Sequence, residues 1–122
     1  MKCNPRDFLE TKGFRKVWKA EEMTDDDLRD LQLTITVSPT IGDVIPGTGS
    51  LRKLRIAAKG KGKRSGARVI YVNFDEYCYT VLVAFYAKNK DPDLTPDQKK
   101  ELSKLIGVLE ESIKKDFFKK RK

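Results

Sequence analysis

The fold is decided by residues 51–87, which read LRKLRIAAKGKGKRSGARVIYVNFDEYCYTVLVAFYA. Three segments of this stretch read as strands: residues 51–57, 67–74 and 77–87. The first alternates apolar and basic side chains, and the other two are rich in β-branched and aromatic residues. A basic glycine loop at 59–66 and a tight turn at Asp75 and Glu76 connect them. Because connections this short can join only antiparallel strands, the stretch predicts an antiparallel sheet.

Two helices are predicted before this sheet. Residues 12–22 carry apolar side chains at helical spacing. Thr24 and Asp27 form a capping box that opens a second helix, and this helix ends before Pro39. Its apolar face consists of Leu28, Leu31 and Ile35. We expect the two helices to pack as a hairpin.

A third helix is predicted after the sheet. Thr95 is placed to cap it, Pro96 occupies the first helical position, and Gln98 completes a capping box. Its apolar stripe consists of Leu102, Leu105, Ile106, Leu109, Ile113 and Phe117. We interpret this stripe as core, and a partner-binding face is the less favoured alternative.

The order of these elements predicts an α+β fold. An antiparallel sheet of three to four strands packs against two N-terminal helices and one C-terminal helix, with residues 6–10 as the short fourth strand. Residues 42–50, GDVIPGTGS, read as an irregular loop. The 122 residues are enough for one domain, 1–122, whose ends at 1–5 and 118–122 are expected to be frayed.

Cysteine and histidine usage restricts the chemistry. The chain has two cysteines, Cys3 and Cys78, and no histidine, so a zinc site of four such ligands cannot form within one chain. No cofactor or metal is implied. The apolar run at 80–87 is too short to cross a membrane and the N-terminus does not resemble a signal peptide, so a cytoplasmic location is expected. A single disulfide is possible, but disulfides are rare there, so both thiols are expected to be reduced, with Cys78 in the core.

Positive charge is concentrated in one segment. The net charge of +8 comes from 26 basic and 18 acidic residues. Eight of the basic residues and no acid lie within 51–70, so the remainder of the chain is electrically balanced. Acidic residues are absent from 44 to 74. A solvated surface normally mixes both signs, so this segment indicates a polyanionic partner, which we take to be RNA.

The spacing of the strand cations suggests a grip on phosphate. Lys53 and Arg55 lie two apart and so share one face of a strand, which Arg68 on the neighbouring strand could join. Tyrosines on such a sheet can stack on unpaired bases, although most are core residues. The glycine-rich stretches lack both the G-x-x-x-x-G-K-[ST] and the G-x-G-x-x-G spacing, which argues against a nucleotide-binding loop.

Two stretches carry a family resemblance. GDVIPGTGSLRKLRIAAKGKGKRSGARVIYV and VLVAFYAKNKDPDLTPDQKKEL, which together span residues 42–102, resemble the toxins of bacterial RelE/HigB-type toxin–antitoxin pairs. The motifs GxGxLRKxR, GKGKRxGxRVIY and YAKN with a following DLT are specific in combination. The resemblance implies metal-independent cleavage of mRNA in the ribosomal A site. It also implies inhibition by a cognate antitoxin, with DNA binding only through the antitoxin complex.

The same resemblance implies roles for individual residues. The RNA 2′-hydroxyl attacks the adjacent phosphate, and Arg68 matches the arginine that faces this phosphate. The candidate catalytic residues are Lys53, Arg55, Arg68, Tyr86 and Lys88, and the candidate RNA-binding residues are Arg52, Lys59, Lys61, Lys63, Arg64 and Tyr71. The loop cations among them resemble a grip on 16S ribosomal RNA.

The chain departs from well-known members of the family at two places. Those members have an arginine near Lys88 and Asn89 and a tyrosine near Leu94 and Thr95. The general base therefore stays open between Lys53, Lys88 and Tyr86.

Two non-enzymatic functions compete with this interpretation. One is a basic RNA-binding protein of the translation apparatus. The other is a DNA-binding repressor, which would need a recognition helix rich in basic residues. Residues 24–37 begin with acids and carry only one base, Arg29, so the repressor is the weaker alternative.

Overall fold

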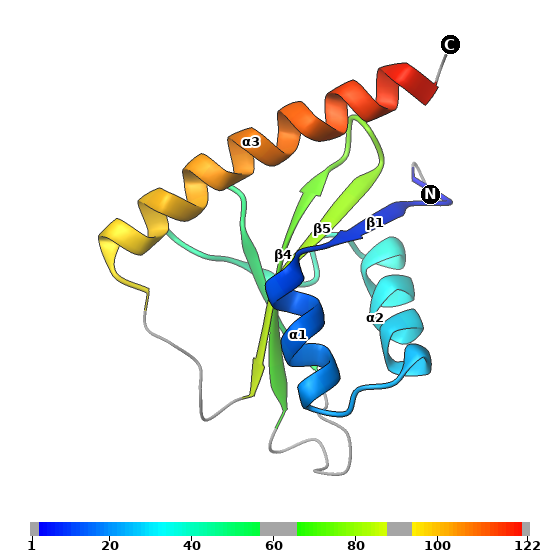
Figure 1. Ribbon diagram of the computed structural model, residues 1–122, viewed down its shortest axis with the longest axis vertical. Coiled ribbons are helices and arrows are strands. Elements are labelled where there is room, and N and C mark those ends of the chain that lie inside the picture. Colours follow the sequence, from blue (N-terminus) through cyan, green and yellow to red (C-terminus); the bar gives the residue numbers. More distant parts are fainter. Residues whose placement is uncertain (1–2, 57–65, 88–93, 121–122) are drawn as a thin grey trace.

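The computed structural model describes residues 3–56, 66–87 and 94–120. Along the chain the elements are β1 (Asp7–Glu10), α1 (Lys12–Ala20), α2 (Asp25–Val37), β2 (Asp43–Val44), β3 (Arg52–Ile56), β4 (Ala67–Phe74), β5 (Tyr79–Ala87) and α3 (Pro96–Lys120). The strands form one sheet in the order β1-β5-β4-β3-β2. Helices α1 and α2 cover one face of this sheet and α3 crosses the other (Figure 1). The predicted α+β class, with two helices before the sheet and one after it, is confirmed.

The sheet differs from the predicted one at its edges. Strands β3, β4 and β5 pair antiparallel as expected. The edge strand β1, however, runs parallel to β5, and at the other edge β2 contributes only two residues. Within the ranges that the structure describes, the sheet is therefore mixed and five-stranded. A parallel partner far along the chain leaves no local sequence signal, because no tight turn links the two strands.

Strand β5 begins later than predicted. Residues 75–78 form a turn in which the amide of Tyr77 donates to the carbonyl of Phe74 at 3.0 Å and the amide of Cys78 to that of Asp75 at 3.3 Å. Cys78 has a positive φ of 53°, which ends the turn before Tyr79 starts the strand.

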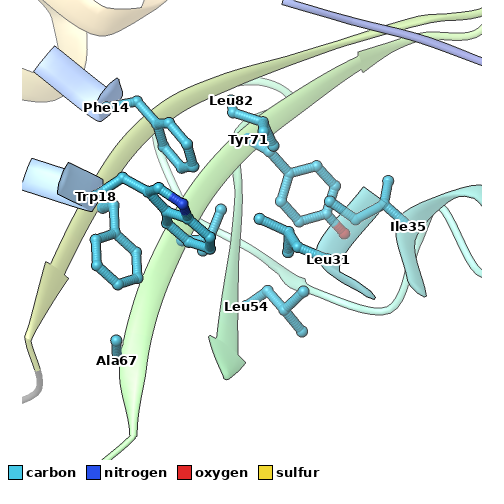
Figure 2. Packing of buried hydrophobic residues seen from close by; sticks show 10 residues of the cluster. Phe14, Trp18, Leu31, Ile35, Leu54, Ala67, Tyr71 and Leu82 are labelled. Atoms are coloured by element: carbon cyan, nitrogen blue, oxygen red, sulfur yellow. The ribbon is translucent and has the colours of Figure 1, made fainter. Parts of the chain in front are cut away.

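The core on the α1/α2 side is built around aromatic side chains. Phe14 and Trp18 of α1 stack with ring centroids 5.3 Å apart, and Trp18 and Phe85 pack in a T-shaped arrangement with centroids 4.8 Å apart. Leu31 and Ile35 of α2 close the cluster from the other helix (Figure 2). The predicted apolar face of α2 is therefore correct, since Leu28 also packs against this cluster. Thr11 caps α1 by accepting from the amide of Phe14, and the predicted capping box at Thr24 and Asp27 caps α2.

Helix α3 covers the opposite face of the sheet with part of its predicted stripe. Ile113 is 1% exposed, and Leu102, Ile106 and Leu109 pack partly buried against the same cluster. Leu105 is 39% exposed and points away from this core, contrary to the prediction. The capping box of Thr95 and Gln98 is present. Among the helices of the described residues, none is both long and apolar enough to span a bilayer.

The cysteines do not follow the sequence prediction. Cys3 and Cys78 form a disulfide, with Cα atoms 5.2 Å apart. Cys78 lies half-buried in the turn and not in the core, whereas Cys3 is 4% exposed. The prediction was wrong because it argued from the cellular compartment alone. The parallel placement of β1 beside β5, which brings the two residues together, could not be foreseen.

A buried arginine stands next to the disulfide. Arg6, whose side chain is 2% exposed, donates to Asp75 at 2.8 Å and to the Thr80 hydroxyl at 3.0 Å. The network continues from Thr80 to Asn73 at 2.8 Å and from Asn73 to the carbonyl of Pro39, again at 2.8 Å. It thus links the β4–β5 turn to the segment that follows α2.

The two ends of the chain were expected to be frayed. Within the described residues, Cys3 is held by the disulfide and α3 continues to Lys120.

Candidate nucleic-acid interface

Three neighbouring strands align a row of polar side chains. In the β3–β4 register Arg55 stands opposite Arg68, and in the β4–β5 register Arg68 stands opposite Tyr86. Lys53 lies two residues before Arg55 and therefore faces the same side. We call Lys53, Arg55, Arg68 and Tyr86 the cationic face. This register places the three cations on one face of the sheet, as predicted.

The strand pattern explains why these residues face away from the α1/α2 core. Their neighbours Leu54, Ala67, Val69 and Phe85 all belong to that core. Because side chains alternate along a strand, the residues between them must point to the other side of the sheet. Arg55 is exposed, and Lys53, Arg68 and Tyr86 are partly exposed.

The cationic face lies beyond the part of the sheet that α3 covers. Ile70 and Val72 of β4 and Val81 of β5 pack on the α3 side, in the same cluster as Ile113. Tyr86 is partly buried at the margin of that cluster. The same sheet surface is therefore apolar under α3 and basic toward the start of β4 and the end of β5.

The opposition of Arg55 and Arg68 favours an anion. Residues directly opposite in an antiparallel pair have Cβ atoms about 4.5–5.5 Å apart, which lets both guanidinium groups reach one anion. A phosphate between two guanidinium groups accepts paired hydrogen bonds from each. Strand backbones on both sides hold the cations in place, so little order is lost when the anion binds.

Gly66 lies directly before β4, and its lack of a side chain leaves space for the side chain of Arg55. A Cβ on Gly66 would lie 2.7 Å from the carbonyl oxygen of Ile56 and 3.4 Å from both Cγ and Nε of Arg55. The side chain of Arg55 thus lies against the glycine backbone. The sequence predicts Gly66 only as part of a glycine-rich loop, so its role beside Arg55 was missed. The signal that could have revealed this role is its position directly before a strand that carries a candidate arginine.

Arg52 lies on the other face of the sheet. It precedes Lys53 by one residue and donates from Nη1 to the carbonyl oxygens of Gly42 at 2.6 Å and Thr40 at 3.2 Å. It therefore fastens the segment before β2 to β3. The structure does not bring it together with the cationic face.

Tyr71 cannot stack on a base, so its prediction as an RNA-binding residue is wrong. Its side chain is fully buried in the α1/α2 core. The hydroxyl donates to the carbonyl of Pro39 and accepts from the amide of Gly42, both at 2.9 Å. Burial raises the pKa of the Tyr71 hydroxyl above its ordinary value. Gly42 is needed here, because a Cβ would lie 2.9 Å from the Tyr71 ring.

The other candidates lie outside the described residues: Lys59, Lys61, Lys63, Arg64 and Lys88. Over the described ranges, no group of three or more Cys, Asp or Glu side chains is arranged to hold a metal ion. The chemistry that the described part of the site offers is anion binding by arginine and lysine, with a tyrosine hydroxyl alongside.

The sequence of the chain matches that of one toxin family. A family model described as the RelE toxin of the RelE/RelB toxin–antitoxin system matches residues 7–120. Among solved structures, the chain is similar to an arginine double mutant of the E. coli toxin RelE in the free state. That similarity has a TM-score of 0.49 and 15% sequence identity, and it covers 66% of this chain and 81% of the other.

Proposed function

The chain belongs to the RelE family of toxins from toxin–antitoxin systems, and on this premise we propose that it is an endoribonuclease that cleaves mRNA in the ribosomal A site. Membership implies a cognate antitoxin as a protein partner. The observation that supports cleavage is the cationic face, where Arg55 and Arg68 stand opposite each other on a rigid sheet.

The proposed reaction needs neither metal nor histidine. The 2′-hydroxyl of the RNA loses its proton and attacks the neighbouring phosphorus, and the bond from phosphorus to the 5′-oxygen breaks. The products are a 2′,3′-cyclic phosphate and a 5′-hydroxyl, which takes up a proton. Negative charge builds on the non-bridging oxygens during the attack, and fixed guanidinium groups stabilise such charge strongly in a partly dry site.

Roles in this scheme follow from position. Arg68 is central in the row, between Arg55 and Tyr86, and we assign it to the scissile phosphate. Arg55 supports the same phosphate from β3. Lys53, Tyr86 and Lys88 are the candidates for accepting the proton of the 2′-hydroxyl and donating one to the leaving 5′-oxygen.

The RNA-binding roles fall on the basic loop. Lys59, Lys61, Lys63 and Arg64 follow β3 directly in the sequence and are too numerous to touch one phosphate. We assign them to 16S ribosomal RNA, so that the ribosome positions the mRNA over the cationic face. The protein would then bind DNA only as part of its complex with the antitoxin.

Expression without a partner tests the proposal. The chain is induced in bacteria lacking the antitoxin gene, growth is followed, and the 5′ ends of mRNA are mapped. Cleavage predicts growth arrest with new 5′-hydroxyl ends at positions linked to codons. The alternative, a basic RNA-binding protein that does not cut, is supported by the same cationic face and predicts no new ends. Arrest without new ends would therefore decide for the binder.

A further inference from the structure

The two cysteines meet at the end of the sheet far from the cationic face. Cys78 precedes the first residue of β5 and Tyr86 lies near its end, so the two are about 25 Å apart along the strand. We propose that the Cys3–Cys78 bond is a reversible thiol–disulfide site. Exchange with small thiols of the glutathione class opens and closes it in the folded protein, and its state sets how firmly the N-terminal segment holds to β5. This inference goes beyond the proposed function, because it requires no RNA.

The two cysteine residues differ in their exposure to solvent. Cys3 is 4% exposed, whereas Cys78 lies half-buried in the 75–78 turn. An incoming thiolate therefore reaches Sγ of Cys78 first. It forms a mixed disulfide there while the bond to Cys3 breaks, and Cys3 leaves as a thiolate that takes up a proton. A second thiolate then attacks the external sulfur of the mixed disulfide and releases Cys78.

The exchange is balanced in electrons and protons. Two external thiols are oxidised to one disulfide, and the protein disulfide gains two electrons and two protons. Oxidised glutathione drives the same steps backwards. Both protein sulfurs lie near the carbonyl oxygen of Asp75, at 3.6 Å for Cys3 and 3.8 Å for Cys78. In the reduced state that carbonyl can accept from a thiol, so the turn keeps a polar partner.

The bond holds a segment that has little apolar burial of its own. Next to it, the guanidinium of Arg6 is buried against Asp75, and its Nε has no hydrogen-bond partner among the described residues. Burying a charged group with one unpaired nitrogen costs free energy, so the ion pair with Asp75 opposes the release of this arginine to water less than a fully paired one would. The disulfide opposes that release by tying residue 3 to residue 78.

Strand β1 is the element that the bond controls. It is an edge strand of four residues, and its burial alternates between exposed and half-buried. Its first contact with the turn is the hydrogen bond from the amide of Asp7 to the carbonyl of Cys78, at 2.9 Å. Short edge strands open locally at low free-energy cost. Reduction should therefore loosen β1 while the pairing of β3 with β4, which carries Arg55 and Arg68, stays intact.

The experiment uses the full chain and two readouts. Folded protein is equilibrated in glutathione buffers of graded ratio, free thiols are alkylated, and the added mass is measured. Amide hydrogen exchange is recorded for the fully oxidised and fully reduced states. We expect both cysteines to change together without denaturant. Exchange at Asp7–Glu10 should rise roughly tenfold or more on reduction, with no change at Arg52–Ile56.

Thermal unfolding gives a third readout and a control. A bridge that closes a loop of this length should raise the unfolding midpoint by roughly 10 °C, and reductant should remove that gain. The double variant Cys3→Ser/Cys78→Ser should melt like the reduced protein in either buffer and should not respond to the glutathione ratio.

Three results would overturn the proposal. Free thiols that persist in oxidised glutathione would show that the pair does not form. If the bond opened only in denaturant, it would be a permanent structural disulfide and not an exchange site. Unchanged exchange at β1 on reduction would show that the bond does not control the edge strand. None of these outcomes bears on RNA cleavage, so the proposed function stands or falls separately.

Discussion

Arg68 is the residue on which the proposed chemistry depends most. It stands between Arg55 and Tyr86 on the central strand of the three that form the cationic face. If it stabilises charge on the scissile phosphate, Arg68→Ala should lower cleavage by roughly 100-fold or more, as the loss of one fixed donor to a developing oxyanion does. Codon-linked cleavage on purified ribosomes measures this effect.

A matched variant separates the loss of charge from the loss of the site. Arg29 lies on α2, where it pairs with Asp26 at 3.3 Å, and its side chain is 74% exposed. Arg29→Ala removes the same charge and should leave cleavage unchanged. Equal losses in both variants, or full activity of a folded Arg68→Ala protein, would refute the assignment.

Tyr71 gives a second prediction at this scale, about stability. Tyr71→Phe removes a buried hydroxyl that donates to Pro39 and accepts from Gly42, and it leaves the Gly42 amide without that acceptor. The free energy of unfolding at neutral pH should fall by about 1–3 kcal/mol, as measured in urea. RNA cleavage per folded molecule should not change, since the ring is buried away from the cationic face.

The pH dependence of this variant has a definite sign. Burial raises the pKa of the Tyr71 hydroxyl above 10.0 in the folded protein. Its contribution to stability is therefore complete below pH 10 and is lost as the unfolded chain begins to ionise at higher pH. The stability difference between the wild type and Tyr71→Phe should begin to shrink as the pH rises past about 10, the ordinary pKa of tyrosine, and should go on shrinking until the pH passes the raised pKa of the folded protein. A constant difference over this range would contradict the assigned cause.

These residues also show where sequence reasoning succeeds. Lys53 and Arg55 alternate with Leu54 and Ile56, so the period of the strand alone places both cations on one face. Tyr71 was misassigned because six of the eight residues of β4 are buried, on both faces of the sheet. Such a strand lacks the polar–apolar alternation that would tell one face from the other.

Among the elements, α3 is a long helix that only a few side chains hold against the sheet. Ile113 is its one fully buried apolar side chain within the described residues. Ile113→Ala should lower the free energy of unfolding by about 2–4 kcal/mol, because it removes buried methyl groups and leaves a cavity under the helix. Val108→Ala, on the same helix at a position 67% exposed, should change it by no more than about 0.5 kcal/mol. Similar losses for the two would mean that α3 does not pack as described.

The local signals of α3 were predictable and its full placement was not. Thr95 and Gln98 fix its start through a capping box that can be read in four residues. Which stripe faces the sheet depends on distant partners: Tyr79 donates to Asp116 at 2.6 Å, and Ser103 donates to the carbonyl of Thr48 at 3.2 Å. Leu105 falls outside this face although its spacing fits the stripe. The parallel edge strand β1 was likewise beyond local reasoning.

At the scale of the whole molecule, charge is segregated along the chain and across the fold. Residues 44–74 include many basic side chains and no acidic one. Helix α2, by contrast, begins with three acids, Asp25, Asp26 and Asp27. A toxin with such a basic surface must be silenced by its antitoxin. We expect an antitoxin segment with acidic and apolar residues to cover the cationic face, folding as it binds.

This arrangement predicts how the association depends on salt. Complementary charges speed the encounter of two proteins, whereas apolar burial mainly slows their separation. The association rate constant should therefore fall by roughly tenfold or more from low to high salt, with little change in dissociation.

Lys53→Ala/Arg55→Ala should reduce both the rate constant at low salt and its salt dependence. Arg29→Ala/Lys104→Ala removes two charges from exposed helix ion pairs elsewhere and should have the smaller effect. Stopped-flow mixing of the toxin with its cognate antitoxin measures both rates. If the association rate constant did not depend on salt, or if the two double variants lowered it equally, the antitoxin would bind away from the cationic face.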